Sequence, residues 1–199
     1  MGSTRTGSVV PSRPSAARAR ILATADRLFY TEGIRSVGVH RLVEEAAVTR
    51  VTLYRHFPSK DDLVVTYLAD RAAANEQAIS AMMAEHADDP RSALRGMAEM
   101  VSAGNFANEW RGCAFINAAA EEFEADHPAR AVAHRHRAWI IATTADLLRE
   151  LGHPTPAATA QILMMLRTGA VVGASLDDPT DLSANFLLAW DALVALGDR

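Results

Sequence analysis

Apolar residues recur at spacings of three and four positions along most of the 199-residue chain. Prolines and glycines fall between these periodic segments, and no alternation of apolar and polar residues is long enough to predict a strand. Spacings of three and four place apolar side chains on one face of a helix. The pattern therefore predicts an all-α fold of about nine helices.

The first four predicted helices carry end signals. Gly33 follows the first helix, where a C-cap needs a left-handed residue. Thr49 is an N-cap residue type for the third helix, and Ser59 with Asp62 resembles a capping box for the fourth. We expect these helices at residues 15–32, 39–46, 49–57 and 59–85.

The rest of the chain has softer breaks. Residues 1–14 contain several glycines, prolines and serines, so we expect a flexible arm there. Prolines and glycines also delimit the later helices. We expect these at residues 88–104, from near 112 onward, and at 128–152, 156–176 and 179–197.

Charge is distributed unevenly between the two ends of the chain. The net charge of −4 divides into +6 for residues 1–60 and −10 for residues 61–199. A basic head on an acidic body is typical of a protein in which only the head approaches phosphates, although charge alone also fits a chance segregation of solvated side chains. Cys113 is the only cysteine, and no apolar run approaches the roughly 20 residues that span a bilayer. We therefore expect a cytoplasmic protein.

The segment from 33 to 63 has the pattern of a helix-turn-helix. Two short helices lie on either side of a turn of about three residues, and their apolar positions form a mutual interface. Leu53 and Phe57 would anchor the second helix, which leaves several polar and β-branched side chains facing outward: Arg50, Val51, Thr52, Arg55 and the tip of Tyr54. Arginine pairs with guanine, and threonine and valine methyl groups contact thymine methyls. The alternative interpretation is an ordinary solvated helix face.

This segment resembles the DNA-binding domain of the TetR/AcrR-type bacterial transcriptional regulators. The resemblance covers residues 15–75 and is most specific in TLYRHFPSKDDL at 52–63, preceded by Leu28, Phe29 and Gly33. It implies that His40, Arg50, Val51 and Thr52 face the bases of double-stranded DNA. It also implies that Tyr54, His56 and Lys60 contact phosphates.

The resemblance further implies a homodimeric repressor or activator with a variable C-terminal domain that binds a small-molecule inducer. We accordingly divide the chain into an arm at 1–14, a helix-turn-helix domain at 15–75 and an effector-binding and dimerisation domain at 76–199. The sequence departs from the usual pattern at Ala47, where glycine is common, at Val51, where a small residue is common, and near Val37 and Gly38, where threonine is common. These departures alter the expected operator sequence more than the expected fold. In a left-handed turn, Ala47 would cost about 1 kcal/mol.

Flexible and aromatic apolar side chains in the C-terminal part would suit an adaptable ligand pocket. The candidates are Met82, Met97, Met100, Phe106, Trp110, Phe115, Trp139 and Met164. The alternative is that these side chains fill the core.

Small residues at a spacing of four near the C-terminus favour close approach of two helices across a dimer interface. The candidates are Leu166, Gly169, Ala170, Gly173, Phe186 and Trp190. Packing of the same two helices within one chain is equally compatible with the pattern. A two-fold dimer would bind a palindrome whose half-sites lie about one helical turn or slightly more apart.

Other chemistries have little support in the sequence. His134 and His136 are two positions apart and point to different sides of a helix, so with His127 they make a poor metal site. Cys113 in an apolar neighbourhood is more typical of an inert core thiol than of a redox sensor. We predict no enzyme activity, no cofactor and no metal. The favoured function is a ligand-responsive DNA-binding repressor, and the alternatives are an effector-independent DNA-binding protein or a small helical enzyme or metal-binding protein.

Overall fold

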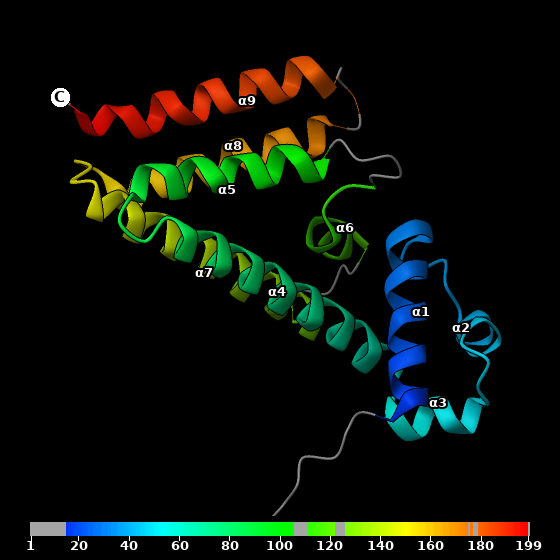
Figure 1. Ribbon diagram of the computed structural model, residues 1–199. Coiled ribbons are helices and arrows are strands. Elements are labelled where there is room, and N and C mark those ends of the chain that lie inside the picture. The colour runs from blue at the N-terminus through cyan, green and yellow to red at the C-terminus, as the bar shows by residue number, and fades with distance from the viewer. Residues whose placement is uncertain (1–14, 106–110, 122–125, 175, 177–178, 199) are drawn as a thin grey trace, which may run out of the picture.

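The computed structural model describes residues 15–105, 111–121, 126–174, 176 and 179–198 (Figure 1). The arm expected at residues 1–14 lies outside them. Within the described residues the chain forms nine α-helices and a short 3-10 helix, which confirms the predicted all-α fold. The helices are α1 (Ala16–Glu32), α2 (Val39–Glu45), α3 (Arg50–His56), α4 (Lys60–Glu85), α5 (Pro90–Asn105), α6 (Ala114–Glu121), α7 (Pro128–Glu150), α8 (Pro156–Gly173) and α9 (Pro179–Val194), followed by the 3-10 turn η1 (Ala195–Asp198).

The helix-end signals read from the sequence are present in the structure. Ser59 and Asp62 form a reciprocal capping box at the start of α4, and the Thr49 hydroxyl accepts a hydrogen bond from the Thr52 amide at the start of α3. Gly33 ends α1 with a φ of 91°. These local signals place the first four helices within a residue or two of the expected bounds, whereas α8 ends at Gly173 instead of near residue 176.

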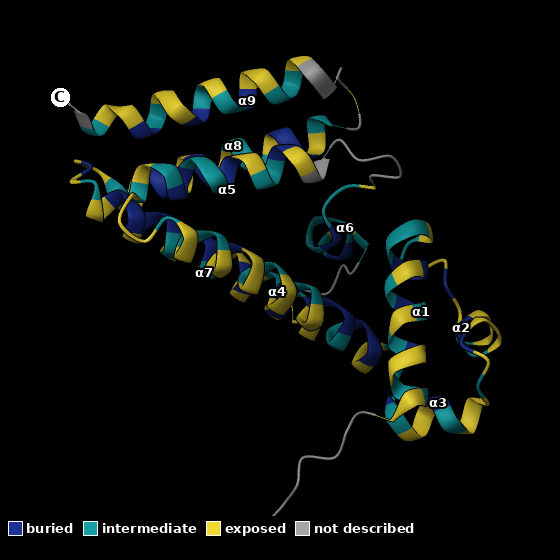
Figure 2. Cartoon of the chain, in the orientation of Figure 1, coloured by how far each residue is buried: buried dark blue, intermediate teal, exposed yellow. Residues whose placement is uncertain are grey.

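The first three helices and the beginning of α4 form a head with its own apolar core (Figures 1 and 2). Ile21 and Leu28 of α1, Leu53 of α3 and Leu63 of α4 are fully buried in this head core. Helices α2 and α3 have only seven residues each, so neither could bury enough surface without α1 and α4 as a platform. The head core therefore fixes the orientation of α3.

The remaining helices form a body with a second apolar core. Helix α7 packs against α4 and α8, and α9 packs against α5 and α8. Leu94, Leu148 and Leu163 are fully buried in this body core. Helix α4 belongs to both parts, because Leu63 lies in the head core and Ile79 in the body core. No helix in the described part of the chain is long and apolar enough to cross a membrane.

Helix α6 lies between the head and the other body helices (Figure 1). Its buried alanines, Ala114 and Ala118, join the head core together with Ala129 and Val132 of α7. The head core thus extends across the division expected near residue 75. The position of the domain boundary stays a prediction.

Candidate nucleic-acid interface and internal cavity

Helix α3 is held at both ends and anchored by its buried face. Thr49 caps the N-terminus, with its hydroxyl 3.1 Å from the Thr52 amide nitrogen. Leu53 and Phe57 are buried at 0 % and 2 % exposure. The turn before the helix passes through Ala47, which has a φ of 49°, the left-handed conformation expected at this position. The outward face of α3 is therefore presented on a short, rigid element.

Three of the predicted base-reading or phosphate-contacting side chains project from this outward face. Val51 is 78 % exposed and Tyr54 is 38 % exposed. Arg50 is also exposed, and its guanidinium carbon lies 5.7 Å from the centre of the Tyr54 ring. A cation over an aromatic face is weakly attracted to it, which limits the directions that the arginine samples. This face offers a charged fork, an apolar side chain and a phenolic hydroxyl within one helical turn.

The other four predicted residues make contacts within the head. His40 is exposed on α2, and its Nδ1 lies 3.9 Å from a Glu44 carboxylate oxygen. The hydroxyl of Thr52 lies 2.9 Å from that of the cap residue Thr49. His56 Nε2 lies 3.1 Å from the hydroxyl of Ser15 at the start of α1. These side chains support the local fold of the head, and their DNA contacts stay predictions.

Lys60 occupies a different position from the one its predicted role suggests. Its ammonium group is partly buried and donates a hydrogen bond of 2.5 Å to the carbonyl oxygen of Ile34. It also lies 5.9 Å from the centre of the Phe29 ring. The phosphate role of Lys60 therefore stays a prediction, beside a structural role that the sequence did not indicate.

Some of the positive charge of the head is used internally. Glu45 of α2 pairs with Arg27 of α1, which joins the two helices, and with Arg41 of its own helix. These partners lower the pKa of the Glu45 carboxyl group, and the hydrogen bond from Arg27 is the largest cause. Arg20 donates to the carbonyl of Ala46 at 3.3 Å. The spacing of Arg41 and Glu45 along one helix could have indicated one of these pairs. The long-range pairs had no sequence signal.

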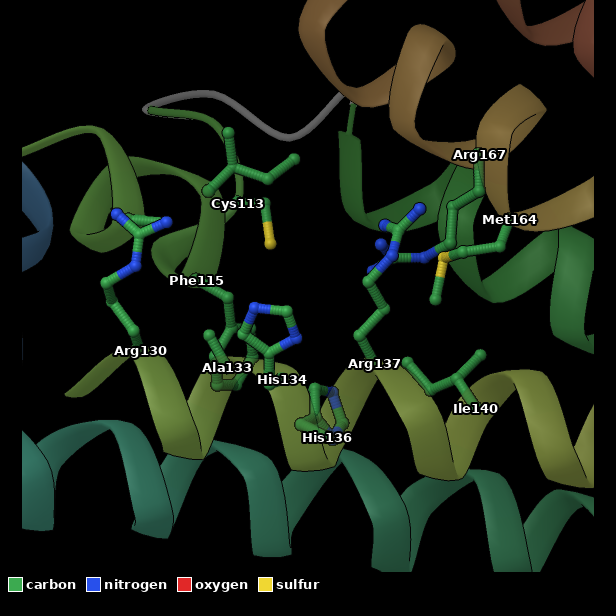
Figure 3. Close-up of a pocket in the computed structure, with 12 residues that line it drawn as sticks. Cys113, Phe115, Arg130, Ala133, His134, His136, Arg137, Ile140, Met164 and Arg167 are labelled. Atoms are coloured by element: carbon green, nitrogen blue, oxygen red, sulfur yellow. The ribbon is translucent and has the colours of Figure 1, made fainter. Parts of the chain in front are cut away.

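The body contains a cavity of about 230 Å³ between α6, α7 and α8 (Figure 3). Two of the eight predicted pocket residues, Phe115 and Met164, line it. Met82, Met97, Met100 and Trp139 pack in the body core, and Phe106 and Trp110 lie outside the described residues. The other lining residues are Cys113, Ile116, Ala119, Arg130, Ala133, His134, His136, Arg137, Ile140 and Arg167. The cavity is therefore less rich in methionine and more basic than the sequence suggested.

Helices α8 and α9 both present apolar surface to solvent, but mostly through residues that the sequence did not single out. Of the predicted interface residues, Gly169 is exposed and Leu166 and Gly173 are half-buried, whereas Ala170, Phe186 and Trp190 are buried in the subunit itself. The exposed apolar side chains are Ile162, Met165 and Val172 on α8 and Leu188 on α9. Both helices are apolar on more than one face. The spacing therefore could not tell which face packs inside the subunit.

Hydrogen bonds connect α6 and the residues before it to the end of α1. The Tyr30 hydroxyl donates to the Gly112 carbonyl at 3.1 Å and accepts from the Arg111 amide at 3.2 Å. A Glu121 carboxylate oxygen accepts from the Arg35 amide at 2.8 Å. One segment of the chain, 111–121, therefore lines the cavity and contacts the head.

The histidines considered as metal ligands have other positions. His136 is buried, with Nδ1 2.9 Å from a Glu76 carboxylate oxygen of α4, and its ring lies 4.5 Å from that of Phe115. His134 lines the cavity, and His127 caps α7. Across the described residues, no group of three or more histidine, cysteine, aspartate or glutamate side chains is arranged to hold a metal ion.

Comparison with known proteins identifies the head and then the whole chain. Residues 21–67 match the family model described as bacterial regulatory proteins, tetR family. The transcriptional regulator TtgR of Pseudomonas putida is 32 % identical over 78 residues, which are 39 % of this chain and 37 % of that protein. The chain thus matches little more than a third of the length of this curated relative.

Two solved structures match over nearly the full length. The crystal structure of SCO4454, a TetR-family transcriptional regulator from Streptomyces coelicolor, is 38 % identical, with a TM-score of 0.88 over 92 % of this chain and 96 % of that one. A TetR-type regulator from Streptomyces avermitilis is 28 % identical, with a TM-score of 0.73 over 89 % of this chain and 99 % of that one. On this full-length likeness, and on the head that carries the family's helix-turn-helix, the chain belongs to the TetR family of non-enzymatic, DNA-binding transcriptional regulators.

Proposed function

We propose that this regulator is a homodimeric repressor that a small molecule, bound in the body cavity, releases from a palindromic operator. The observation that carries the proposal is the double role of segment 111–121, which lines the cavity and is hydrogen-bonded to the head. A ligand that changes the position of α6 changes contacts with α1 at the same time. The alternative of a DNA-binding protein without an effector gives the cavity no role.

Base recognition is assigned to the outward face of α3. Arg50 supplies the fork that pairs with guanine O6 and N7, and Val51 supplies methyl groups for contact with a thymine methyl. Tyr54, His56 and Lys60 are assigned to the sugar-phosphate backbone, where they add affinity without sequence preference. His40 and Thr52 are also assigned to contacts with bases in the major groove.

Dimerisation is assigned to the exposed apolar faces of α8 and α9. Met165 is 60 % exposed and Leu188 is 70 % exposed, and Ile162, Gly169 and Val172 continue the face on α8 at helical spacing. Burying such surface against the same surface of a second copy removes it from water. Two heads related by a two-fold axis would meet successive major grooves, so the operator is a palindrome.

The regulatory step is a shift between two conformations of the dimer. A ligand can shift this equilibrium only by its difference in affinity for the two conformations. We propose that the ligand favours the arrangement in which α4 holds the two heads at a spacing that no longer matches the operator. The ligand then lowers the affinity for DNA by the same factor by which DNA lowers the affinity for the ligand.

A fluorescence anisotropy titration tests the DNA-binding part of the proposal. The probe is a labelled duplex from upstream of the protein's own gene, with an excess of unrelated DNA and near-physiological salt. Tight binding that survives the competitor supports a specific regulator. Binding that the competitor abolishes counts against this operator and against specific recognition of it.

A Tyr30→Phe variant tests the coupling between cavity and head. The substitution removes the hydroxyl that bonds to Gly112 and Arg111 while keeping the ring in place. We expect operator affinity without ligand to change little and the release produced by a saturating ligand to be weakened severalfold. Unchanged release would show that these hydrogen bonds do not transmit the signal.

Light scattering coupled to size-exclusion chromatography tests the dimer. We expect Met165→Glu combined with Leu188→Glu to give a monomer, because burying two unpaired carboxylates at an interface is unfavourable. The control is Val51→Glu, which adds a single carboxylate at an exposed apolar position in the head. A dimer that persists in the double variant would place the interface elsewhere.

A further inference from the structure

The cavity between α6, α7 and α8 has an apolar wall and a basic end. Apolar side chains from all three helices line it: Phe115, Ile116, Ala119, Ala133, Ile140 and Met164. Arg137 of α7 and Arg167 of α8 lie at one end, and Figure 3 shows their side chains reaching toward one another from the two helices. An apolar wall with a few converging polar groups is the usual form of a small-molecule site.

The basic end has no acidic partner in the described part of the chain. No aspartate or glutamate is among the described residues that line the cavity. Arg137 donates a hydrogen bond of 3.1 Å to the Thr168 hydroxyl, which is neutral, and neither Arg137 nor Arg167 forms an ion pair with a described residue. Glu76, from the neighbouring helix α4, is occupied by His136.

This arrangement fits an anion better than a neutral or cationic ligand. Two guanidinium groups that face one another repel. A negative charge placed between them attracts both, and the two attractions outweigh the repulsion. The planar fork of arginine also matches the two oxygens of a carboxylate. A cationic ligand would meet like charge at this end, with no carboxylate among the described lining residues to offset it.

The size of the cavity limits the apolar part of the ligand. An apolar cavity of about 150 Å³ is enough to hold benzene. The volume of about 230 Å³ here therefore accommodates one or two small rings or a short acyl chain together with a charged group. A large polycyclic molecule would need the surrounding helices to move apart.

We infer that the effector is a small amphiphilic carboxylate, with its apolar part against Phe115, Ile140 and Met164 and its carboxylate between Arg137 and Arg167. The inference rests on the proposed effector role of this cavity for its regulatory meaning. The binding chemistry itself depends only on the residues that line the site.

Isothermal titration calorimetry with a matched pair of probes tests the ligand class. The probes are 2-naphthoate and 2-naphthamide, which share the ring system and differ in charge, titrated at constant ionic strength into the full chain without DNA. We expect 2-naphthoate to bind about tenfold or more tightly than the amide, because charge-assisted hydrogen bonds are the stronger ones. Equal affinities, or no binding of 2-naphthoate at the highest soluble concentration, would overturn the inference.

Substitutions locate the charge preference within the cavity. Arg137→Gln and Arg167→Gln should each reduce the preference for 2-naphthoate, and the double variant should abolish it while still binding the amide. The matched control is Arg135→Gln, which removes an exposed arginine of the same helix that does not line the cavity. A preference that survives the double substitution overturns the inference, and circular dichroism melting verifies that each variant is folded.

A cavity-filling variant and a DNA-release assay separate the possible failures. Ala133→Phe should weaken binding of both probes alike, and unchanged binding would place the probes outside the cavity. Binding of 2-naphthoate through both arginines without release of operator DNA would support the ligand class and contradict the effector role. Release by a neutral compound, with no charge-dependent binding, would overturn the ligand class and leave the proposed function intact.

Discussion

The outward face of α3 in the head and the cavity of the body are assembled in different ways. Helix α3, its cap Thr49 and its anchors Leu53 and Phe57 all lie within a dozen neighbouring residues. The cavity is lined by side chains from Cys113 to Arg167, which converge only because α6, α7 and α8 pack together. The helix-turn-helix can therefore be specified by a short sequence motif, whereas the shape and lining of the cavity depend on how the body helices pack.

The two regions also differ in how their charges are used. In the head, Arg27 and Arg41 pair with Glu45, so several of the basic residues hold helices together. In the cavity, Arg137 and Arg167 face one another without an ion pair to any described residue. The paired charges of the head have a structural role, and the converging charges of the cavity are the feature on which the proposed anionic ligand rests.

Truncation of one leucine in each core should produce the largest effects and test whether the two regions are separate. Leu53 and Leu148 are both fully buried, the first in the head core and the second in the body core. Replacing either with alanine should lower the free energy of unfolding by about 2–5 kcal/mol. Leu53→Ala should raise deuterium exchange mainly in α1–α3, and Leu148→Ala mainly in α5 and α7–α9. An even rise over both regions in either variant would show that the head and body open as one unit.

Removal of Arg50 should have the next largest effect, on the choice of DNA sequence. Arg50→Ala should lose about 1–3 kcal/mol of discrimination between operator and scrambled duplex, since the proposed bidentate contact with guanine is lost. Lys60→Ala should instead weaken binding to both duplexes. It should also reduce by about one the slope of log affinity against log salt concentration, because one fewer counterion is released. Anisotropy titrations over a series of salt concentrations measure both quantities. Equal loss of discrimination in the two variants would contradict this division of roles.

The sequence predicted the fold and the head well because their signals are local. The capping box of Ser59 and Asp62 and the left-handed turn at Ala47 are set by neighbours within a few residues. The cavity could not be predicted in the same way, because apolar spacing marks Met97 and Met164 alike and only packing places the second of them at the cavity. Arg137 and Arg167 carried no signal at all, since their convergence depends on how α7 meets α8.

The contact between α1 and α4, which connects the head to the body, should weaken when Arg71 is removed. This residue of α4 donates to both carboxylate oxygens of Asp26 in α1, at 2.6 and 3.0 Å, and its guanidinium carbon lies 4.4 Å from the centre of the Tyr30 ring. Partial burial by itself would lower the pKa of Arg71, but the hydrogen bonds to Asp26 and the neighbouring charges raise it overall.

Arg71→Ala should lower the free energy of unfolding by about 1–2 kcal/mol, as one charged hydrogen-bonded pair and the cation–π contacts with Tyr30 and Tyr67 are lost from a partly exposed site. Urea denaturation of Arg71→Ala, Asp26→Asn and the double variant measures the coupling between the two residues. The two single effects should not add in the double variant. Strict additivity would mean that the bridge contributes nothing to the contact between α1 and α4.

The smallest expected effect comes from the turn of the head, where Ala47 has a φ of 49°. The left-handed conformation costs a residue with a Cβ about 1–2 kcal/mol, whereas glycine gives the unfolded chain extra freedom worth about 0.4–1 kcal/mol. The strain relieved exceeds the entropy that glycine adds to the unfolded chain, so Ala47→Gly should stabilise the protein by about 0.5–1 kcal/mol. Ala46→Gly is the matched control, because Ala46 has a right-handed φ of −76° and is buried, and the same substitution should be destabilising there. Thermal unfolding of the two variants should therefore move in opposite directions, and a loss of stability in both would mean that the turn holds Ala47 without strain. Operator preference should stay unchanged in Ala47→Gly, since the substitution relieves the backbone without altering the side chains that α3 presents.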